Sequence, residues 1–264
     1  MIKKSAHSKY QQPVIVHGES GCGKTALMAK VAQDCVDWFP CKPVRLLRFL
    51  GTSPQSSSIK KVYISLIRQI WQNYGEKPQS LVTYSQDFSF LRLYFEALLT
   101  KIDTSDKPLV IVCDSVEQLT TDDYAHEMNW LPLVLPPNVY LIVSVNSEVS
   151  NILHNTRRIL RDPAAYVEVT ALEKTVAREI LQDMLNSAGR NLTTEQMDFV
   201  TYKYGRTPQA LYLKLAFEQA KYWPSYCHKD RWILSSCIND AIHQVFDNLE
   251  MEHENVLVEK ALGK

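Results

Sequence analysis

Apolar residues follow two patterns along the first two thirds of the chain. Short apolar runs predict strands at 13–17, 44–50, 109–114, 139–145 and 165–169, and the run at 109–114 is typical of a strand buried on both faces. Between them, apolar residues recur every three or four positions after residue 24, from 59 to 74 and over 88–102, which predicts helices. Alternating strands and helices predict an α/β fold with a parallel sheet and right-handed crossovers.

The pattern changes near Thr170. From there to the end no strong strand pattern occurs, and the capping-box sequences at 170–173 and 193–196 predict two helix starts. The segment 204–208 interrupts the helical spacing and introduces a helix over 209–221, and helical spacing returns over 233–263. We therefore predict a sheet domain over residues 1–169, followed by a helical part.

The segment between the first strand and the first helix has the spacing G-x-x-x-x-G-K-T. Glycines in this spacing let successive backbone N–H groups point at one anion, and the helix N-terminus adds its positive end. Lys24 would reach the β- and γ-phosphates, and the Thr25 hydroxyl would bind Mg²⁺. A glycine-rich turn with a surface lysine is the alternative. The predicted phosphate-binding residues are Gly18, Glu19, Ser20, Gly21, Cys22, Gly23, Lys24 and Thr25.

Two carboxylates follow the strand at 109–114. Asp114 ends the apolar run in the Walker B pattern and is a candidate for orienting the water ligands of Mg²⁺. Glu117 could polarise an attacking water, although a solvated loop acid is the alternative. Ser144 and Asn146 stand at the end of the strand at 139–145, beside the expected position of the γ-phosphate.

Composition excludes several classes of protein. The chain has 29 Lys and Arg against 29 Asp and Glu, so no overall charge favours nucleic acid or an anionic membrane. The start lacks the apolar core of a secretory leader, and no apolar run is long enough to span a membrane. The cysteines form no C-x-x-C pair, so we expect reduced thiols in a soluble, cytoplasmic protein. Cys22 could be redox-sensitive, or a small residue that merely fits the loop.

The phosphate loop, the segment 48–57, the strand end 114–119 and the helix start 207–215 together resemble a NACHT domain. More narrowly, they are similar to the NACHT domains of the NACHT and WD-repeat proteins, with nephrocystin-type and telomerase-associated relatives close by. The resemblance implies a STAND-type P-loop ATPase with sheet order 5-1-4-3-2. It also implies a helical domain over 170–232 and the start of a winged helix over 233–264.

The resemblance also implies roles for single residues. Gly18 to Thr25 would bind the phosphates of ATP or ADP, Thr25 and Asp114 would hold Mg²⁺, and Pro208 would lie near adenine. For Pro208 a helix-start proline without ligand contact is the alternative. The family often has Asp at the position of Glu117 and an arginine at that of Asn146. An asparagine cannot supply the arginine's charge, so we expect slow hydrolysis.

Three functions fit these features. The first is an ATP-driven switch with slow Mg²⁺-dependent hydrolysis that controls conformation and self-association. The second is a scaffold that nucleotide stabilises without turnover. The third is a GTPase or a small-molecule kinase. The sequence lacks the motif with which GTPases recognise guanine, and only arginines 157, 158 and 161 could form the lid of a kinase. The family's sensor repeats and effector domain are missing, so we expect a fragment or truncated product whose protein partners bind elsewhere.

Overall fold

A computed structural model describes residues 11–75, 87–149, 151–226 and 228–253 of the chain. The chain divides into two compact units. Met1–Ser20 with Lys24–Val169 is called the sheet unit, and Gly21–Gly23 with Thr170–Lys264 is called the helical unit. The predicted domains over 1–169, 170–232 and 233–264 stay predictions, and the last of them lies partly outside the described residues.

The sheet unit is built on a five-stranded parallel sheet in the order β2-β3-β4-β1-β5. This is the predicted order 5-1-4-3-2 read from the other edge, so the predicted α/β fold is confirmed. The strands are β1 (Val14–Gly18), β2 (Val44–Phe49), β3 (Leu109–Asp114), β4 (Val139–Asn146) and β5 (Tyr166–Glu168). In the register, Gly18 pairs with Asn146, and Phe49 pairs with Asp114. The carboxyl ends of β1, β3 and β4 therefore meet at one edge of the sheet.

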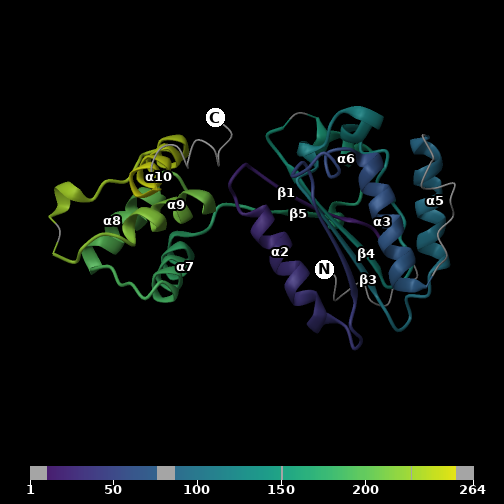
Figure 1. Cartoon of the computed structure of the whole chain (residues 1–264), viewed down its shortest axis with the longest axis horizontal. Helices are drawn as coiled ribbons and strands as arrows, with labels where there is room; N and C mark the ends of the chain where they lie inside the picture. The colour runs from purple at the N-terminus through teal and green to yellow at the C-terminus, as the bar shows by residue number, and fades with distance from the viewer. Residues whose placement is uncertain (1–10, 76–86, 150, 227, 254–264) are drawn as a thin grey trace. The chain divides into compact units, whose positions relative to one another are not determined.

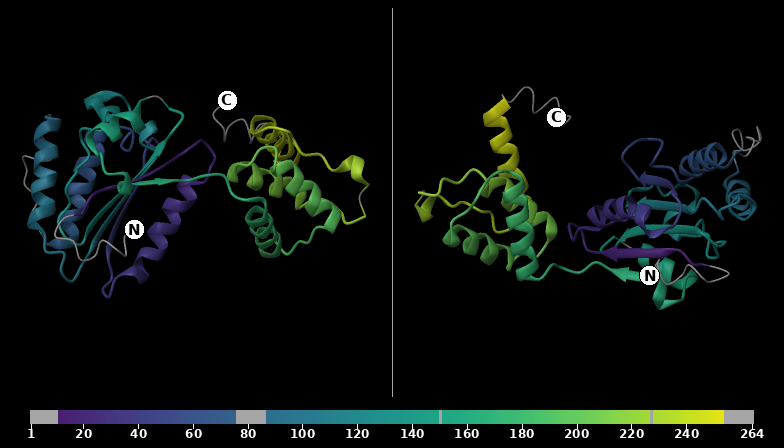
Figure 2. Two further views of the ribbon diagram at one scale, coloured as in Figure 1. Left: turned by 180° about the vertical axis from the view of Figure 1, so that it is seen from behind. Right: turned by 90° about the horizontal axis from the view of Figure 1, so that it is seen from below.

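Helices cover both faces of this sheet (Figure 1). The helix α2 (Lys24–Asp34) lies on one face, and α3 (Ile59–Tyr74) and α5 (Phe88–Lys101) lie on the other (Figure 2). Alternate strand residues serve the two layers: Ile15 and Ile111 pack in the cluster with α3 and α5, and Val16 and Val110 pack in the cluster with α2. The strands are apolar on both faces because both faces are buried.

The predicted helices of the sheet unit agree with the structure, with two differences. α3 has the predicted bounds and ends on Gly75 at φ 72°. The apolar spacing that predicts a helix after residue 24 runs to Phe39, but α2 ends at Asp34 and the 3-10 helix η1 (Cys35–Trp38) follows it. The short helix α6 (Ile152–Ile159) was not predicted.

Further 3-10 turns connect the elements of the sheet unit, namely η2 (Val116–Gln118), η3 (Asp122–Glu127) and η4 (Pro163–Ala165). The aromatic residues Tyr63 and Trp71 of α3 are buried and pack in the core of the sheet unit. Within the described residues, none of the helices combines the length and the apolar character needed to cross a bilayer.

The helical unit contains α7 (Lys174–Ser187), α8 (Thr194–Tyr204), α9 (Ala210–Ala220), η5 (Lys229–Arg231) and α10 (Ile238–His253). Thr193 forms the predicted capping box with Gln196. The capping box predicted at 170–173 is wrong, because α7 begins at Lys174 and Glu173 caps it without a side-chain hydrogen bond. The predicted helical spacing beyond residue 253 falls outside the described residues.

Candidate functional site

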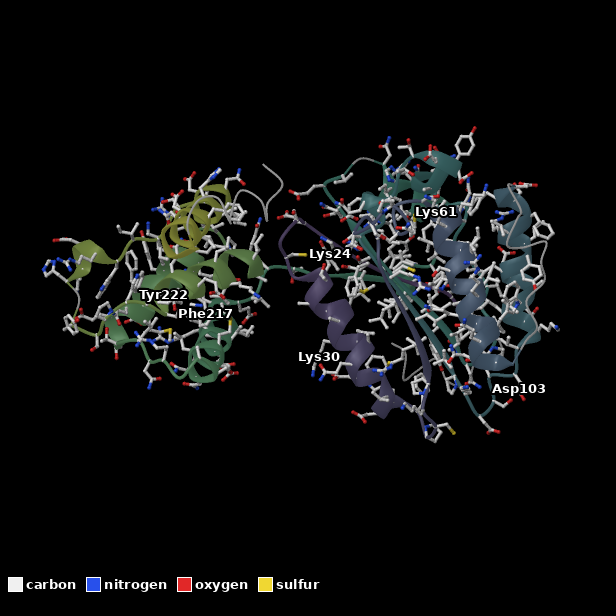
Figure 3. The ribbon with its side chains drawn as sticks, in the orientation of Figure 1. Lys24, Lys30, Lys61, Asp103, Phe217 and Tyr222 are labelled. Atoms are coloured by element: carbon white, nitrogen blue, oxygen red, sulfur yellow. The ribbon has the colours of Figure 1, made fainter. Side chains whose placement is uncertain are left out.

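The phosphate loop joins the end of β1 to the start of α2. Gly21 and Gly23 have φ values of 73° and 108°, a left-handed backbone that side chains with a Cβ disfavour. Lys24 opens α2 (Figure 3) and is buried. Its Nζ donates hydrogen bonds to the carbonyls of Gly18, at 2.9 Å, and Glu19, at 2.7 Å. The ammonium group thus lies against the backbone of the loop, where the motif requires it.

Asp114 is buried at the end of β3, and both of its carboxylate oxygens accept hydrogen bonds. Thr25 Oγ1 donates to Oδ2 over 2.7 Å, and Ser144 Oγ donates to Oδ1 over 2.5 Å. The N–H of Ser115, which has a left-handed φ of 66°, donates to Ser144 Oγ over 2.7 Å. Since β4 lies between β1 and β3, the sheet order brings the loop threonine and the Walker B carboxylate together.

The oxygen atoms of Thr25 and Asp114 fit a magnesium site. Both groups are hard oxygen donors, and they lie within hydrogen-bond distance of each other. The described residues contain no cluster of three or more His, Cys, Asp or Glu side chains that would form a metal cage. Mg²⁺ seldom uses such a cage, because phosphate oxygens and water supply most of its ligands in nucleotide sites.

Glu117 lies in η2 and reaches the end of β4. Its Oε2 accepts a hydrogen bond from the backbone N–H of Asn146 over 3.0 Å. The Asn146 side chain in turn accepts a hydrogen bond at Oδ1 from the N–H of Glu148 over 3.0 Å. The structure therefore brings Glu117 and Asn146 together beside Gly18, the strand partner of Asn146.

Glu148 is a site residue that the sequence analysis missed. Its Oε2 accepts a hydrogen bond from the loop N–H of Ser20 over 2.8 Å. No motif marks this glutamate. The signal that could have found it is the strand order, because residues just after β4 must emerge beside the start of the loop that follows β1.

Pro208 lies in the helical unit, between α8 and α9, and Gln209 caps α9. These positions agree with a proline near a helix start. Its contact with adenine stays a prediction.

Two titratable groups near the site have pKa values shifted by burial. Burial raises the pKa of the Cys113 thiol to about 12, so this neighbour of Asp114 stays protonated at neutral pH. Burial, together with the charge of Arg157, lowers the pKa of His17 in β1. Cys35, Cys41, Cys113 and Cys237 are free thiols, and Cys227 lies outside the described residues.

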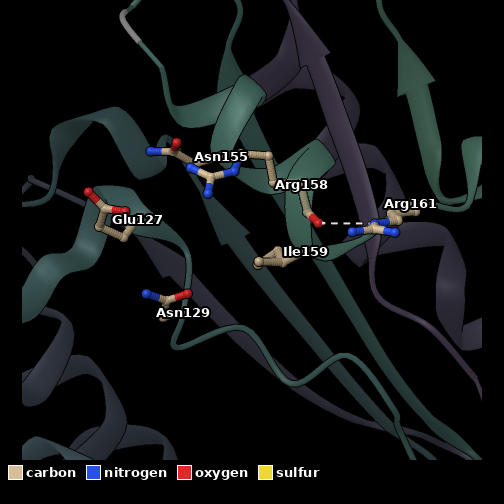
Figure 4. A pocket seen from close by; sticks show the side chains of 6 residues that line it. All are labelled: Glu127, Asn129, Asn155, Arg158, Ile159 and Arg161. Carbon is tan, nitrogen blue, oxygen red and sulfur yellow. Dashed lines mark hydrogen bonds between the residues drawn. The ribbon is translucent and has the colours of Figure 1, made fainter.

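A separate pocket of about 440 Å³ lies between η3 and α6 (Figure 4). Among its lining residues, Arg161 Nε donates to the carbonyl of Arg158 over 3.5 Å (Figure 4). Its lining residues are Glu127, Asn129, Asn155, Arg158, Ile159 and Arg161. The predicted phosphate and metal residues do not line it, so this pocket is distinct from the predicted nucleotide site.

Comparison with solved structures finds proteins with a similar fold. One is the ORC1 protein of Aeropyrum pernix, solved in complex with DNA. The alignment covers 91% of this chain and 61% of the ORC1 chain, with a TM-score of 0.51 and 14% identity. Another is a Walker-type ATPase of Pyrococcus abyssi. The alignment covers 95% of this chain and 71% of the ATPase chain, with a TM-score of 0.51 and 12% identity. At these identities the likeness shows the fold alone.

Comparison with curated proteins gives nearer relatives. NACHT domain- and WD repeat-containing protein 1 of Homo sapiens is 32% identical over 260 residues, which is 97% of this chain and 16% of that protein. NACHT and WD repeat domain-containing protein 2 of Homo sapiens is 29% identical over 259 residues, or 95% of this chain and 14% of that protein. The chain thus spans less than a fifth of the length of either relative. The model of the NACHT domain matches residues 12–188, and the chain therefore belongs to the NACHT domain family.

Proposed function

We propose that the chain is an ATP-binding switch with slow, Mg²⁺-dependent hydrolysis that controls its conformation and self-association. The observation that carries this proposal is the 2.7 Å hydrogen bond between Thr25 and Asp114, beside the buried Lys24. It joins the two motifs that a P-loop NTPase needs for its phosphates and its metal. Membership of the NACHT family supports the same reading.

In this proposal residues 18–25 bind the phosphates of ATP or ADP through backbone N–H groups and Lys24. The Thr25 hydroxyl and the Asp114 carboxylate hold Mg²⁺, which neutralises charge on the phosphates when it is bound. Pro208 contacts adenine, as the family resemblance implies.

Slow turnover follows from the groups near the γ-phosphate. Glu117 is the candidate for positioning the attacking water, but its carboxylate also accepts the N–H of Asn146. Asn146 is neutral, so it cannot offset the charge that develops on the transferred phosphoryl group. Both features favour a switch that holds its nucleotide over an enzyme with rapid turnover.

The proposed partners are other copies of the chain and proteins that bind segments of longer relatives. The printed names of those relatives include WD repeats. We propose no nucleic-acid partner, although a fold neighbour was solved with DNA, because the net charge of this chain is zero. Membrane binding is not proposed, and the proposed location is the cytoplasm.

The Lys24→Ala variant tests nucleotide binding. Removing the loop's ammonium should lower ATP affinity by about 100-fold, the effect of losing a charge-assisted contact of about 3 kcal/mol. Calorimetric titration measures the affinity, and circular dichroism checks that the fold remains.

Self-association is tested by measuring the molecular mass of the parent chain in solution. A non-hydrolysable ATP analogue should raise this mass, and ADP should not.

Lys30→Ala is the matched control for Lys24→Ala. Lys30 lies on the same helix, α2, but is exposed and pairs with Asp34 at 3.0 Å (Figure 3). Its loss should leave ATP affinity within about twofold of the parent, because a surface ion pair contributes little. Equal affinities in Lys24→Ala and Lys30→Ala would refute the phosphate site.

A second function, a scaffold that ATP stabilises without turnover, is favoured by the hydrogen bond that ties Glu117 to Asn146. ATP at about 100 times its Kd would add about 2.7 kcal/mol of stability, which suffices for such a role.

The Glu117→Gln variant separates the two functions. Glutamine can still accept the N–H of Asn146, so ATP affinity should not change. If Glu117 positions water, steady-state phosphate release should fall by about 100-fold or more. Phosphate release by the Lys24→Ala variant gives the background rate for this comparison. Parent turnover no faster than that of Lys24→Ala would support the scaffold. Equal turnover in the parent and Glu117→Gln, above that background, would refute the catalytic role of Glu117.

A further inference from the structure

A carboxylate lies against the phosphate loop of this structure. Glu148 Oε2 is 2.8 Å from the backbone nitrogen of Ser20, in a contact between residues 128 positions apart in the chain. Backbone N–H groups of such a loop are the groups that bind phosphate oxygens. Glu148 thus places a negative charge on a donor that a nucleotide would use.

The backbone around Glu148 is tied to the site at two further points. The N–H of Ser147 donates to the carbonyl of Gly18 over 3.0 Å, which extends the pairing of β4 with β1. The N–H of Glu148 donates to Asn146 Oδ1 over 3.0 Å. These bonds fix the backbone and leave the exposed carboxylate able to turn away from the loop.

Other carboxylates in this part of the sequence lie at the same edge of the sheet as Glu148. Between Pro108 and Thr156, the segment that supplies β3 and β4, the sequence has six acidic residues and neither Lys nor Arg. Asp114 and Glu117 already bring negative charge to the same edge of the sheet. Lys24 is the cation that the phosphate loop itself contributes.

From this geometry we infer that Glu148 is a specificity-determining residue that disfavours a nucleoside triphosphate relative to a diphosphate. The inference rests on the proposed nucleotide-binding function. The γ-phosphate is expected on the side of Thr25, Asp114 and the end of β4, and Glu148 follows β4 by two residues. A third phosphate adds negative charge there, so the Glu148 carboxylate repels it and must leave Ser20. ADP brings less charge to that side and is repelled less.

The test is calorimetric titration of the whole chain, in Mg²⁺, with ADP and with a non-hydrolysable ATP analogue. Glu148→Gln keeps the shape and the acceptor oxygen but removes the charge. It should raise affinity for the analogue by about tenfold, as expected for removing one like charge at a partly screened distance, and change ADP affinity by less than about threefold. Glu148→Lys should raise affinity for the analogue further, because it reverses the charge.

Glu127→Gln is the matched control, since it removes a charge from the same acidic segment but lines the separate pocket. It should leave the ratio of the two affinities unchanged. If Glu148→Gln changes both affinities equally or neither, or if Glu148→Lys binds the analogue no better than the parent, the inference is overturned while nucleotide binding stands. If the parent binds neither nucleotide, the proposed function itself fails.

Discussion

The carboxyl end of the sheet and the core of the helical unit both bury polar side chains, but these side chains differ in their charge and in their hydrogen-bond partners. At the sheet edge the buried groups include the charged side chains of Lys24 and Asp114, which are 8% and 3% exposed. Lys24 bonds to loop carbonyls, and Asp114 bonds to the hydroxyls of Thr25 and Ser144. These partners are themselves groups that a bound phosphate or metal would contact.

In the helical unit the buried polar side chains that the structure describes are neutral, and three of them, Gln196, Tyr204 and Tyr212, bond to backbone carbonyls. The hydroxyl of Tyr204 donates to Leu172 over 2.8 Å, and that of Tyr212 donates to Ser235 over 2.6 Å. The Gln196 side chain completes the cap of α8 and donates to Pro224. Each bond fixes a connecting segment onto a helix.

The comparison separates two uses of buried polarity. A buried charge is costly unless it is paired. At the sheet edge, a bound phosphate or metal could take the place of the groups that now pair with the buried charges. A hydroxyl that bonds to a backbone carbonyl in a core has no such exchange and only specifies the fold. Substitutions at the sheet edge should therefore change binding, and substitutions in the helical core should change stability.

Among the substitutions that test this contrast, Leu181→Ala in α7 should have the largest effect, and the effect should be on stability. Leu181 is fully buried in the core of the helical unit, so its truncation removes apolar burial and leaves a cavity. We expect the free energy of unfolding to fall by about 2–5 kcal/mol. Urea unfolding followed by circular dichroism and tryptophan fluorescence measures this change.

Val176→Ala controls for that substitution on the same helix. Val176 is 40% exposed, so its truncation should change stability by no more than about 0.5 kcal/mol. If the two variants were equally stable, the helical core would not have the packing described here.

The sequence predicted the sheet and the phosphate loop because both depend on local patterns. The run at 109–114 is apolar on both faces, since α2 covers one face and α3 with α5 covers the other. The glycines of the loop are required where the backbone turns left-handed, at Gly21 and Gly23. Spacing alone therefore located Lys24, Thr25 and Asp114.

The sequence could not predict features that depend on distant partners. Residues 170–173 have a capping-box sequence, but the Leu172 carbonyl accepts the hydroxyl of Tyr204 and the backbone at Glu173 is extended. α6 has eight residues and buries only Ile152 and Thr156, too few to produce a clear apolar pattern. Glu148 belongs to no motif and meets Ser20 only because β4 lies beside β1.

A smaller effect is expected from Asp114→Asn at the sheet edge. The amide keeps the size of the carboxylate and one acceptor oxygen for Thr25 or Ser144, but it lacks the charge that Mg²⁺ requires. Mg²⁺ should then enhance ATP affinity about 10- to 100-fold less than in the parent, while affinity in EDTA stays the same. Calorimetry with and without Mg²⁺ measures both values. The control Ser144→Ala, which removes only a hydroxyl that orients Asp114, should reduce the enhancement less than Asp114→Asn does. An undiminished Mg²⁺ enhancement in Asp114→Asn would show that this carboxylate serves the fold, as the buried tyrosines of the helical unit do, and the contrast between the two regions would not hold.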